Sequence, residues 1–530
     1  MTRPARDLGE LTIRYLGEGR LRGARLEGRP IATTGLAGRR VIAAVTHDSR
    51  TVEPGGVFVA IPGTRDDGHD HVPEAVARGA AAIVVERALP DLPVAQLVVD
   101  DARAALASAA AWWEGDPSHE LVVVGITGTD GKTTTAYLAV AALEAAGRRT
   151  GMVGTISTRI GGTTEAHEEH ATTPEAPTLQ ATLRAMVEAG DEVAVIETTS
   201  HGLALERVGS VAYDIAIFTN LSHEHLELHG SWEAYRDAKL SLFDRLRDAV
   251  AKPDRPRRPT AIVNLDDPTA GAFIGVARDA GAVVVTYGTE PAADLRATRV
   301  AEDAAGLHLT VQGGEGSGPG DEVDLRLAGR FNVHNALAVV ALGQALDLDP
   351  AAVRRGLASL EGVPGRMERV DAGQPFGVIV DFAHSPASLR TVLDLLAPGA
   401  AARGGEVIAV FGSAGERDTA KRPQMGRIAG ERSRLVVVTD EDPRGEDRLA
   451  ILDQIARGAE AAGRRRGHDL LLIADRRAAI EAAFEAARPG DVVLLAGKGH
   501  ERAIAGPDGD QPWDERSVAL AVLADMGYEA

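Results

Sequence analysis

Apolar residues form short continuous runs that alternate with helical segments through the middle of the chain. The runs "LVVVGI", "EVAVIE", "DIAIFTN" and "TAIVNL" are bounded by turn-forming residues, as is typical of buried strands in a parallel sheet. The segment from Lys132 to about Ala146 is predicted to be a helix. Because strands and helices alternate, this part of the chain is predicted to be a doubly wound α/β domain.

A second series of apolar runs begins after "EGVPGRMERV". The runs "GVIVDFA", "EVIAVFG", "RLVVVTD", "DLLLIA" and "DVVLLAG" are separated by helical stretches and predict a Rossmann-like domain of about 165 residues. Shorter runs between residues 40 and 100, "GVFVAIPG" and "AAIVVE", predict a small α/β domain. We therefore predict three domains, which span residues 1–115, 116–362 and 363–530.

Composition excludes several classes of protein. The 530 residues carry a formal net charge of −20, which argues against a general nucleic-acid binder, because a phosphate backbone requires a basic surface. The chain has no cysteine, so thiolate metal sites and cysteine nucleophiles are excluded. No run approaches the roughly 18 apolar residues of a membrane span, and the N-terminus lacks the apolar region of a secretory signal. We expect a cytoplasmic protein that binds neither nucleic acid nor membrane.

The stretch "GITGTDGKTTT", residues 125–135, joins the first of these strands to the predicted helix. Gly128 and Gly131 allow a tight turn in which backbone N–H groups bind phosphate oxygens. Lys132 can reach the β and γ phosphates, and the Thr133 hydroxyl can bind Mg²⁺. The spacing departs from the Walker pattern, because five residues rather than four precede Gly131 after Gly125. The candidate phosphate-binding residues are Thr127, Gly128, Thr129, Asp130, Gly131, Lys132, Thr133 and Thr134.

A phosphate-bound Mg²⁺ requires carboxylate ligands, and Glu197 stands at the end of the strand "VAVIE", where ligands gather in open α/β sheets. Downstream, "HEHLE" looks like a metal cluster, of which we expect one residue to be a ligand. Lys239 follows on a helix predicted to begin near Trp232, and an unmodified lysine cannot bind Mg²⁺. A nucleotide held in this way could drive a switch, a motor, a phosphoryl transfer or a ligation, and the loop alone does not choose between them.

Eight motifs in order resemble those of the Mur ligases over roughly residues 45–505: "TGTDGKTTT", "ETTSHG", "TNLSHEHLELHGSWEAYRDAK", "GRFNVHNALAV", "GRMERV", "DFAHSP", "GERDTAKRP" and "GKGHE". The resemblance is strongest to the branch that adds the third residue of the peptidoglycan stem peptide. It implies an ATP-dependent amide ligase with an N-terminal UDP-sugar-binding domain, a central P-loop ATPase domain and a C-terminal Rossmann-like amino-acid-binding domain. In such a ligase ATP phosphorylates the D-Glu carboxylate of UDP-MurNAc-L-Ala-D-Glu, and an amine displaces the phosphate. We expect a monomer.

The resemblance also assigns residues. It implies two Mg²⁺ ions held by Thr133, Glu197, His225 and Lys239, the last as a carbamate formed with CO₂, and a catalytic set of Lys132, Glu197, His225 and Lys239. Nucleotide contacts are implied at Asn332, Asn335, Arg366, Asp381 and His384. Contacts to the UDP-linked substrate are implied at Ser49, in "THDSR" near "PGTRDDG", and at Thr172, Thr173, Thr199 and Arg207. Leu205 stands where the family has a glutamine, which puts one substrate hydrogen bond in doubt.

The amino-acid substrate depends on "TDEDPRGED". Diaminopimelate-adding relatives resemble one another in a D-N-P-R motif whose arginine binds the distal carboxylate, and Arg444 retains that arginine. Asp442 replaces the asparagine, however, and with Glu441 it could bind the terminal ammonium of L-lysine or L-ornithine; both acids could instead pair with Arg444. The sequence favours meso-diaminopimelate by a small margin. The implied amino-acid-binding residues are Arg417, Glu441, Asp442, Pro443, Arg444, Gly497 and Glu501.

Three other functions remain as alternatives. A sister ligase, either the D-Ala-D-Ala-adding enzyme or a folylpolyglutamate synthase, shares the phosphate-binding motif but is disfavoured by "DPR" and "GKGHE". A P-loop GTPase would need an N-K-x-D motif, which the sequence lacks. A non-catalytic ligase-like binding protein would be expected to have lost residues such as Lys132 and Glu197, and both are present.

Overall fold

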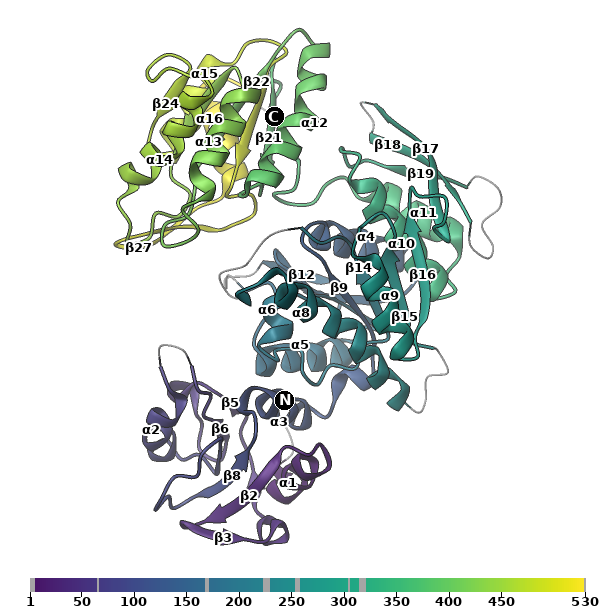
Figure 1. Ribbon diagram of the computed structural model, residues 1–530, viewed down its shortest axis with the longest axis vertical. Coiled ribbons are helices and arrows are strands. Elements are labelled where there is room, and N and C mark those ends of the chain that lie inside the picture. Colours follow the sequence, from purple (N-terminus) through teal and green to yellow (C-terminus); the bar gives the residue numbers. More distant parts are fainter. Residues whose placement is uncertain are drawn as a thin grey trace. The chain divides into compact units, whose positions relative to one another are not determined.

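A computed structural model describes residues 5–63, 66–166, 171–222, 229–252, 258–303, 306–313 and 321–528 (Figure 1). The chain divides into two compact units. The first contains residues 1–299, 310–323 and 334–357, and the second contains residues 300–309, 324–333 and 358–530. Each unit is described by itself below.

The N-terminal part of the first unit is built on a six-stranded sheet with the order β3-β2-β8-β7-β6-β5. Strands β5 to β8 are parallel, whereas β2 and β3 join antiparallel at the edge. The sheet of the small α/β domain predicted between residues 40 and 100 therefore includes two strands, β2 and β3, that come earlier in the sequence. The elements are β1 Arg6–Asp7, α1 Leu8–Gly17, β2 Leu21–Leu26, β3 Arg29–Ile31, β4 Arg40–Val41, β5 Val45–Thr46, β6 Val57–Val59, α2 Val72–Ala77, β7 Ala82–Val85, β8 Ala95–Val99 and α3 Ala102–Glu114.

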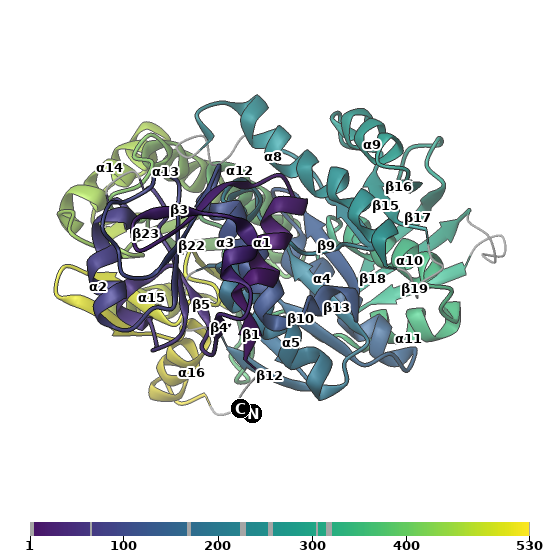
Figure 2. The same cartoon turned by 90° about the horizontal axis from the view of Figure 1, so that it is seen from below.

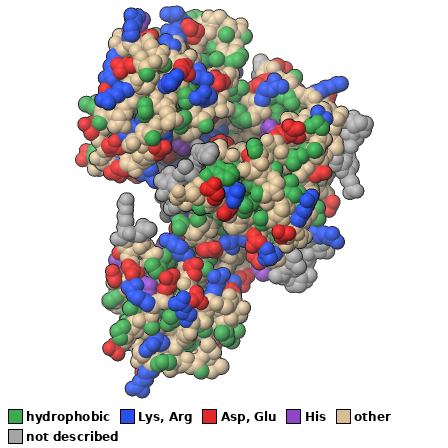
Figure 3. All heavy atoms as spheres, in the orientation of Figure 1, with side chains coloured by type: hydrophobic (Ala, Val, Ile, Leu, Met, Phe, Trp, Pro, Cys, Tyr) green, Lys and Arg blue, Asp and Glu red, His purple; other side chains and the backbone are tan. Residues whose placement is uncertain are grey.

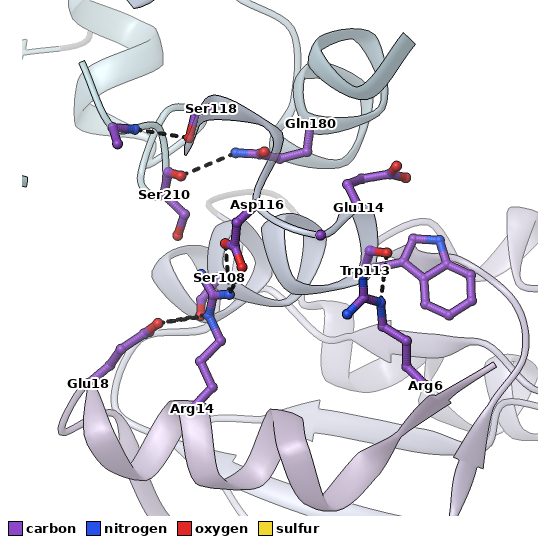
Figure 4. A network of polar contacts seen from close by, with 12 residues as sticks. Arg6, Arg14, Glu18, Ser108, Trp113, Glu114, Asp116, Ser118, Gln180 and Ser210 are labelled. Atoms are coloured by element: carbon purple, nitrogen blue, oxygen red, sulfur yellow. Dashed lines mark hydrogen bonds and ion pairs between the residues drawn. The ribbon is translucent and has the colours of Figure 1, made fainter. Parts of the chain in front are cut away.

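Polar contacts fix the segment that leaves α3 and leads to the next sheet (Figure 4). Asp101 caps the start of α3, and Gly115 ends the helix in the left-handed conformation with φ +75°. The Arg14 guanidinium donates to both oxygens of Asp116, at 2.8 and 2.9 Å, and to the Ser108 hydroxyl. The connection is therefore held by an ion pair in which one guanidinium nitrogen, Nη1, donates to both carboxylate oxygens.

The central sheet has eleven strands in the order β12-β11-β10-β13-β9-β14-β15-β16-β17-β18-β19. The apolar runs predicted as strands are confirmed as β9, β13, β14 and β15, and the helix predicted from Lys132 is confirmed as α4. The strands are β9 Val122–Thr127, β10 Thr150–Val153, β11 Ser157–Ile160, β12 Thr163–Ala166, β13 Val193–Glu197, β14 Ile215–Phe218, β15 Thr260–Asn264, β16 Val283–Gly288, β17 Leu295–Asp303, β18 Gly306–Gln312 and β19 Asp321–Leu325. The helices are α4 Lys132–Ala145, α5 Ala176–Ala189, α6 Ser200–Ala204, α8 Trp232–Asp244, α9 Ala270–Asp279, α10 Asn332–Ala345 and α11 Pro350–Ser359.

Strand β9 lies between β13 and β14, all parallel, so their carboxyl ends meet at one edge of the sheet. The register pairs Glu197 with Ile126, and Phe218 with Thr127. Helix α4 packs on β9, β10 and β13, and these elements lie together in Figure 2. The loop from β9 to α4 therefore lies at the same edge of the sheet as Glu197, the last residue of β13.

The C-terminal part of the second unit has a six-stranded sheet with the order β20-β21-β25-β22-β23-β24. The five strands predicted from apolar runs are confirmed as β21 to β25 and are parallel, and an antiparallel strand, β20, is added at the edge. The elements are β20 Glu368–Val370, β21 Gly377–Asp381, α12 Pro386–Ala402, β22 Val407–Phe411, α13 Lys421–Arg432, β23 Leu435–Val438, α14 Arg448–Ala461, β24 Leu470–Leu472, α15 Arg476–Ala486, β25 Val492–Ala496, β26 Ala503–Gly506, β27 Gly509–Pro512 and α16 Glu515–Asp525.

Acidic and basic side chains are interspersed on the face drawn in Figure 3. The negative net charge is therefore not gathered into one area of that face. Among the described helices, none combines the length and the apolar character required to cross a membrane.

Candidate active site

The loop between β9 and α4 has the backbone of a phosphate-binding turn. Gly128 has φ +151° and Gly131 has φ +83°. A Cβ atom at Gly128 would lie 1.9 Å from the Thr219 hydroxyl oxygen, and one at Gly131 would lie 2.5 Å from Asn335 Oδ1. Both positions therefore require glycine, for conformation and for space.

Two lysines converge on this loop. Lys132 Nζ donates to the carbonyl oxygens of Gly128 at 3.0 Å and Thr129 at 2.9 Å. Lys239, from α8, donates to the Gly128 carbonyl at 2.7 Å, and its ammonium lies 4.6 Å from the centre of the Tyr235 ring. Lys239 is buried, with 2% of its surface exposed. The structure thus brings together two lysines that are 107 positions apart in the sequence, counted from 132 to 239.

Glu197 is fully buried at the carboxyl end of β13 and accepts three hydrogen bonds. Its Oε2 atom accepts from the hydroxyls of Thr133 at 2.8 Å and Thr155 at 2.9 Å, and its Oε1 atom accepts from the Thr155 backbone N–H at 2.8 Å. The predicted pair of Thr133 and Glu197 is therefore in direct contact. Sequence analysis missed Thr155, which lies between β10 and β11 in no recognisable pattern.

The contact between Thr133 and Glu197 fits a magnesium site, because hydroxyl and carboxylate oxygens are the ligands that Mg²⁺ prefers. Gly154 makes room for the carboxylate, since a Cβ atom there would lie 2.6 Å from Glu197 Oε1. His225, predicted as a further ligand, lies outside the described residues. Among the described residues there is no cluster of three or more His, Cys, Asp or Glu side chains placed so that it could hold a metal ion.

Most of the residues predicted to contact the UDP-linked substrate lie beside Glu197. The Thr173 hydroxyl donates to the Glu197 carbonyl at 2.8 Å and lies 3.0 Å from the Thr199 hydroxyl. Arg207 donates to the Thr173 carbonyl at 2.9 Å, and Thr172 bonds Thr155. Ser49 belongs instead to the N-terminal sheet domain, where its hydroxyl donates to Glu74 at 2.6 Å. Residues 64 and 65 of "PGTRDDG" lie outside the described residues.

The predicted nucleotide contacts fall into two groups. Asn335, on α10, accepts from the Thr135 hydroxyl of α4 at 3.1 Å and lies against the loop at Gly131, while Asn332 is buried at the start of α10. Arg366, Asp381 and His384 lie in the second unit, around the end of β21. There the Arg366 guanidinium lies 4.6 Å from the centre of the Phe382 ring, and Asp381 accepts from the backbone N–H groups of Met367 and Ala383.

The predicted amino-acid-binding residues gather at the carboxyl edge of the C-terminal sheet. Glu441 and Asp442 follow β23, and Gly497 follows β25. Lys498, which sequence analysis missed, is fully buried and bonds Asp442 and Glu501, both at 2.7 Å. Burial raises the pKa of Glu441, whose Oε2 has no hydrogen-bond partner among the described residues. Arg417 is exposed on the loop before α13, and Pro443 and Arg444 follow Asp442.

His500 gives this unit a pH-dependent stability. Burial, followed by the positive charges of Arg366 and Lys498, lowers the pKa of His500 from 6.5 to about 3. Because the pKa is lower in the folded state, the unfolded chain takes up the proton first as the pH falls. We expect the free energy of unfolding to decrease from pH 6.5 to pH 3, by up to about 4 kcal/mol from this group. In His500→Gln the free energy of unfolding should decrease less over the same pH range. Urea unfolding, followed by hydrogen exchange of β25, would measure it at each pH. Equal slopes of the free energy of unfolding against pH in the wild type and the variant would contradict this.

Comparisons with known proteins agree with this geometry. Three family models match: "Mur ligase family, catalytic domain" at residues 41–113, "Mur ligase middle domain" at residues 126–343 and "Mur ligase, glutamate ligase domain" at residues 365–499. A UDP-N-acetylmuramyl-tripeptide synthetase of Roseiflexus sp. (strain RS-1) is 48% identical and covers 92% of this chain and 95% of its own. A UDP-N-acetylmuramoyl-L-alanyl-D-glutamate–2,6-diaminopimelate ligase of Streptomyces coelicolor is 42% identical over 91% of this chain and 92% of its own.

A solved structure of a ligase with the same name as the Streptomyces protein superimposes with a TM-score of 0.61 at 28% identity, covering 91% of this chain and 95% of that one. The identity to the two curated relatives extends over nearly the whole chain and includes all three matched domains. With three matched domains in the expected order and relatives of 42% and 48% identity over nearly the whole chain, the chain belongs to the Mur ligase family and is an ATP-dependent ligase.

Proposed function

We propose that this ligase adds the third residue, a diamino acid, to UDP-MurNAc-L-Ala-D-Glu during synthesis of peptidoglycan precursors. The names of the relatives from Roseiflexus and Streptomyces support this assignment. The observation that carries the chemistry is the direct contact of Thr133 with Glu197 beside the phosphate-binding loop. A site of this kind binds ATP to activate an acid.

The reaction needs activation because a carboxylate is a poor electrophile. The D-Glu carboxylate attacks the γ-phosphorus of ATP, ADP leaves, and an acyl phosphate forms; the amine then attacks the carbonyl carbon, loses a proton and expels phosphate. Lys132 would donate from its ammonium to the β and γ phosphates in place of the loop carbonyls that it now contacts. The turn at Gly128 and Gly131 would hold the triphosphate in line with the carboxylate.

When bound, Mg²⁺ would neutralise the charge that develops on the transferred phosphoryl group. Thr133 and Glu197 would hold one ion, and the resemblance assigns His225 and the carbamate of Lys239 to a second. Thr155 would keep the Glu197 carboxylate in a fixed orientation, because it bonds both of its oxygens. Thr172, Thr173, Thr199 and Arg207 would bind the muramoyl-peptide part of the substrate beside Glu197.

We further propose meso-diaminopimelate as the amine, ahead of L-lysine and L-ornithine. Among the described residues, no ion pair engages the Arg444 guanidinium, so it can bind a second carboxylate in a bidentate manner. Glu441 is buried, and its Oε2 has no hydrogen-bond partner in the part of the chain that the structure describes, so it would accept an ammonium group. Only a substrate that carries both groups on its distal carbon would use both residues.

Phosphate release is the direct test. The protein is incubated with ATP, Mg²⁺ and UDP-MurNAc-L-Ala-D-Glu, and meso-diaminopimelate, L-lysine, L-ornithine or D-Ala-D-Ala is added one at a time, with mass spectrometry of the product. We expect release with meso-diaminopimelate and a product heavier by one diaminopimelyl residue. Lys132→Ala is the control for contaminating ATPase. Turnover with D-Ala-D-Ala alone, or with none of the amines, would reject the assignment; turnover with lysine or ornithine would reject only the choice of amine.

A further inference from the structure

The acid at position 442 has its charge compensated inside the protein. Asp442 Oδ1 accepts from Lys498 Nζ at 2.7 Å and from the Ala505 backbone N–H at 3.0 Å. Lys498 is fully buried and also pairs with Glu501. An Asp442 carboxylate that turned toward a substrate ammonium would leave both a buried ammonium and a backbone N–H without this acceptor, which is costly.

The neighbouring acid differs in this respect. Glu441 is 6% exposed, and its Oε2 atom has no hydrogen-bond partner among the described residues. The two adjacent acids therefore do not form a pair with a common role. Glu441 Oε2 retains the capacity to accept a hydrogen bond, whereas Asp442 Oδ1 already accepts from two donors.

Asp442 also anchors the turn that presents Arg444. The backbone N–H of Arg444 donates to the Ala505 carbonyl at 2.8 Å, so this turn and β26 are joined by two hydrogen bonds, one of them through the Asp442 side chain. Arg444 has φ +52°, a strained backbone conformation for a residue with a side chain. At the other end of the turn, buried Arg422 binds both oxygens of Glu446 at 2.6 and 2.8 Å.

We infer that Asp442 is a positioning residue, which together with Lys498 and Ala505 holds the turn carrying Arg444, and that it does not bind the ammonium of the incoming diamino acid. The inference rests on the proposed function, because it concerns the amino acid that the function requires. It follows that the aspartate at this position does not select lysine or ornithine over a substrate with a distal carboxylate.

Two variants separate positioning from recognition of charge. Asp442→Asn keeps an oxygen that can accept from Ala505 and Lys498, whereas Asp442→Ala removes it. We expect Asp442→Ala to raise the KM for the amino acid about tenfold, the equivalent of one lost hydrogen bond to a charged group, with the KM for ATP unchanged. Asp442→Asn should restore the KM to near the wild-type value and leave the ratio of kcat/KM between meso-diaminopimelate and lysine unchanged.

A tenfold or larger shift of that ratio toward meso-diaminopimelate in Asp442→Asn would overturn the inference, because it would show that the charge of Asp442 reads the ammonium. Asp442→Ala with a KM equal to that of Asp442→Asn would overturn the positioning role. The matched control is Asp508→Asn, an exposed aspartate in the turn between β26 and β27. It should change none of these constants.

Proteolysis tests the same inference without any substrate. Trypsin can cleave after Arg444, and cleavage requires the turn to open locally. We expect Asp442→Ala to be cut at the Arg444–Gly445 bond about tenfold faster than the wild type, with Asp442→Asn and Asp508→Asn close to the wild type. Equal rates in all variants would overturn the inference. If the wild-type protein turned over none of the amines, the proposed function would be rejected. The proteolysis experiment uses no substrate, so it would still test whether Asp442 holds the turn.

Discussion

Replacing Glu197 by glutamine is expected to lower kcat by about 10²–10³-fold, because the carboxylate that would hold Mg²⁺ against the transferred phosphoryl group becomes a neutral amide. The amide also presents an N–H group where Glu197 now accepts from Thr133 and Thr155. The measurement is phosphate release in the presence of each amine, together with Mn²⁺ binding followed by electron paramagnetic resonance. Metal affinity should fall along with kcat.

The matched control is Glu192→Gln, on the segment that leads into the same strand. The Glu192 side chain is 45% exposed and pairs with Arg148 at the surface, so its loss should alter stability by less than about 1 kcal/mol and leave kcat unchanged. Wild-type metal affinity in Glu197→Gln, or an equal loss of kcat in both variants, would contradict the assignment of Glu197 to the metal.

Replacing Arg476 by methionine is expected to destabilise the C-terminal unit by about 3–5 kcal/mol, because it leaves a buried carboxylate without its partner. Arg476 is fully buried, pairs with Glu515 at 2.7 Å, and donates to the carbonyls of Asp440 at 2.9 Å and Ala496 at 2.8 Å. These two carbonyls are the points at which β23 and β25 lead into Glu441 and Gly497. The amino-acid-binding loops should therefore loosen, which hydrogen exchange of β25 and α16 would detect.

Two further variants test the cause. In the double variant Arg476→Met with Glu515→Leu, the unpaired charge is removed as well, and part of the lost stability should return. Arg477→Met, the next position, breaks only a surface pair with Asp525 and should cost less than about 1 kcal/mol. If Arg476→Met cost no more than Arg477→Met, the buried ion pair would not be the cause.

The central strands could be predicted because parallel strands covered on both faces must be apolar throughout, so each appears as one continuous run. Strands β9, β13, β14, β15 and β21 to β25 were found in this way. Strands at or next to the edge of a sheet, such as β2, β19 and β20, were missed, because a strand with one covered face mixes polar and apolar residues. In β19, for example, exposed and buried positions alternate.

The phosphate-binding loop could be predicted because its chemistry is local: the turn, the lysine and the threonine are consecutive in the chain. Residues that act through a distant partner could not. Thr155 binds Glu197 across 42 positions, and Lys498 binds Asp442 across 56. Neither has a spacing that a sequence pattern could reveal, since only the order of strands in each sheet brings the partners together.

The sequence alone indicated the α/β class and the central strands and located the candidate phosphate-binding loop, because these follow from short-range patterns of hydrophobicity and turn chemistry. The tertiary structure decided which carboxylates are available to a ligand. Glu441 and Asp442 are equivalent as neighbouring acids in the sequence, but of these two only Asp442 forms an ion pair with Lys498 among the described residues. Burial and the geometry of hydrogen bonds determine the availability of a charge, and both depend on residues that are brought together only by folding.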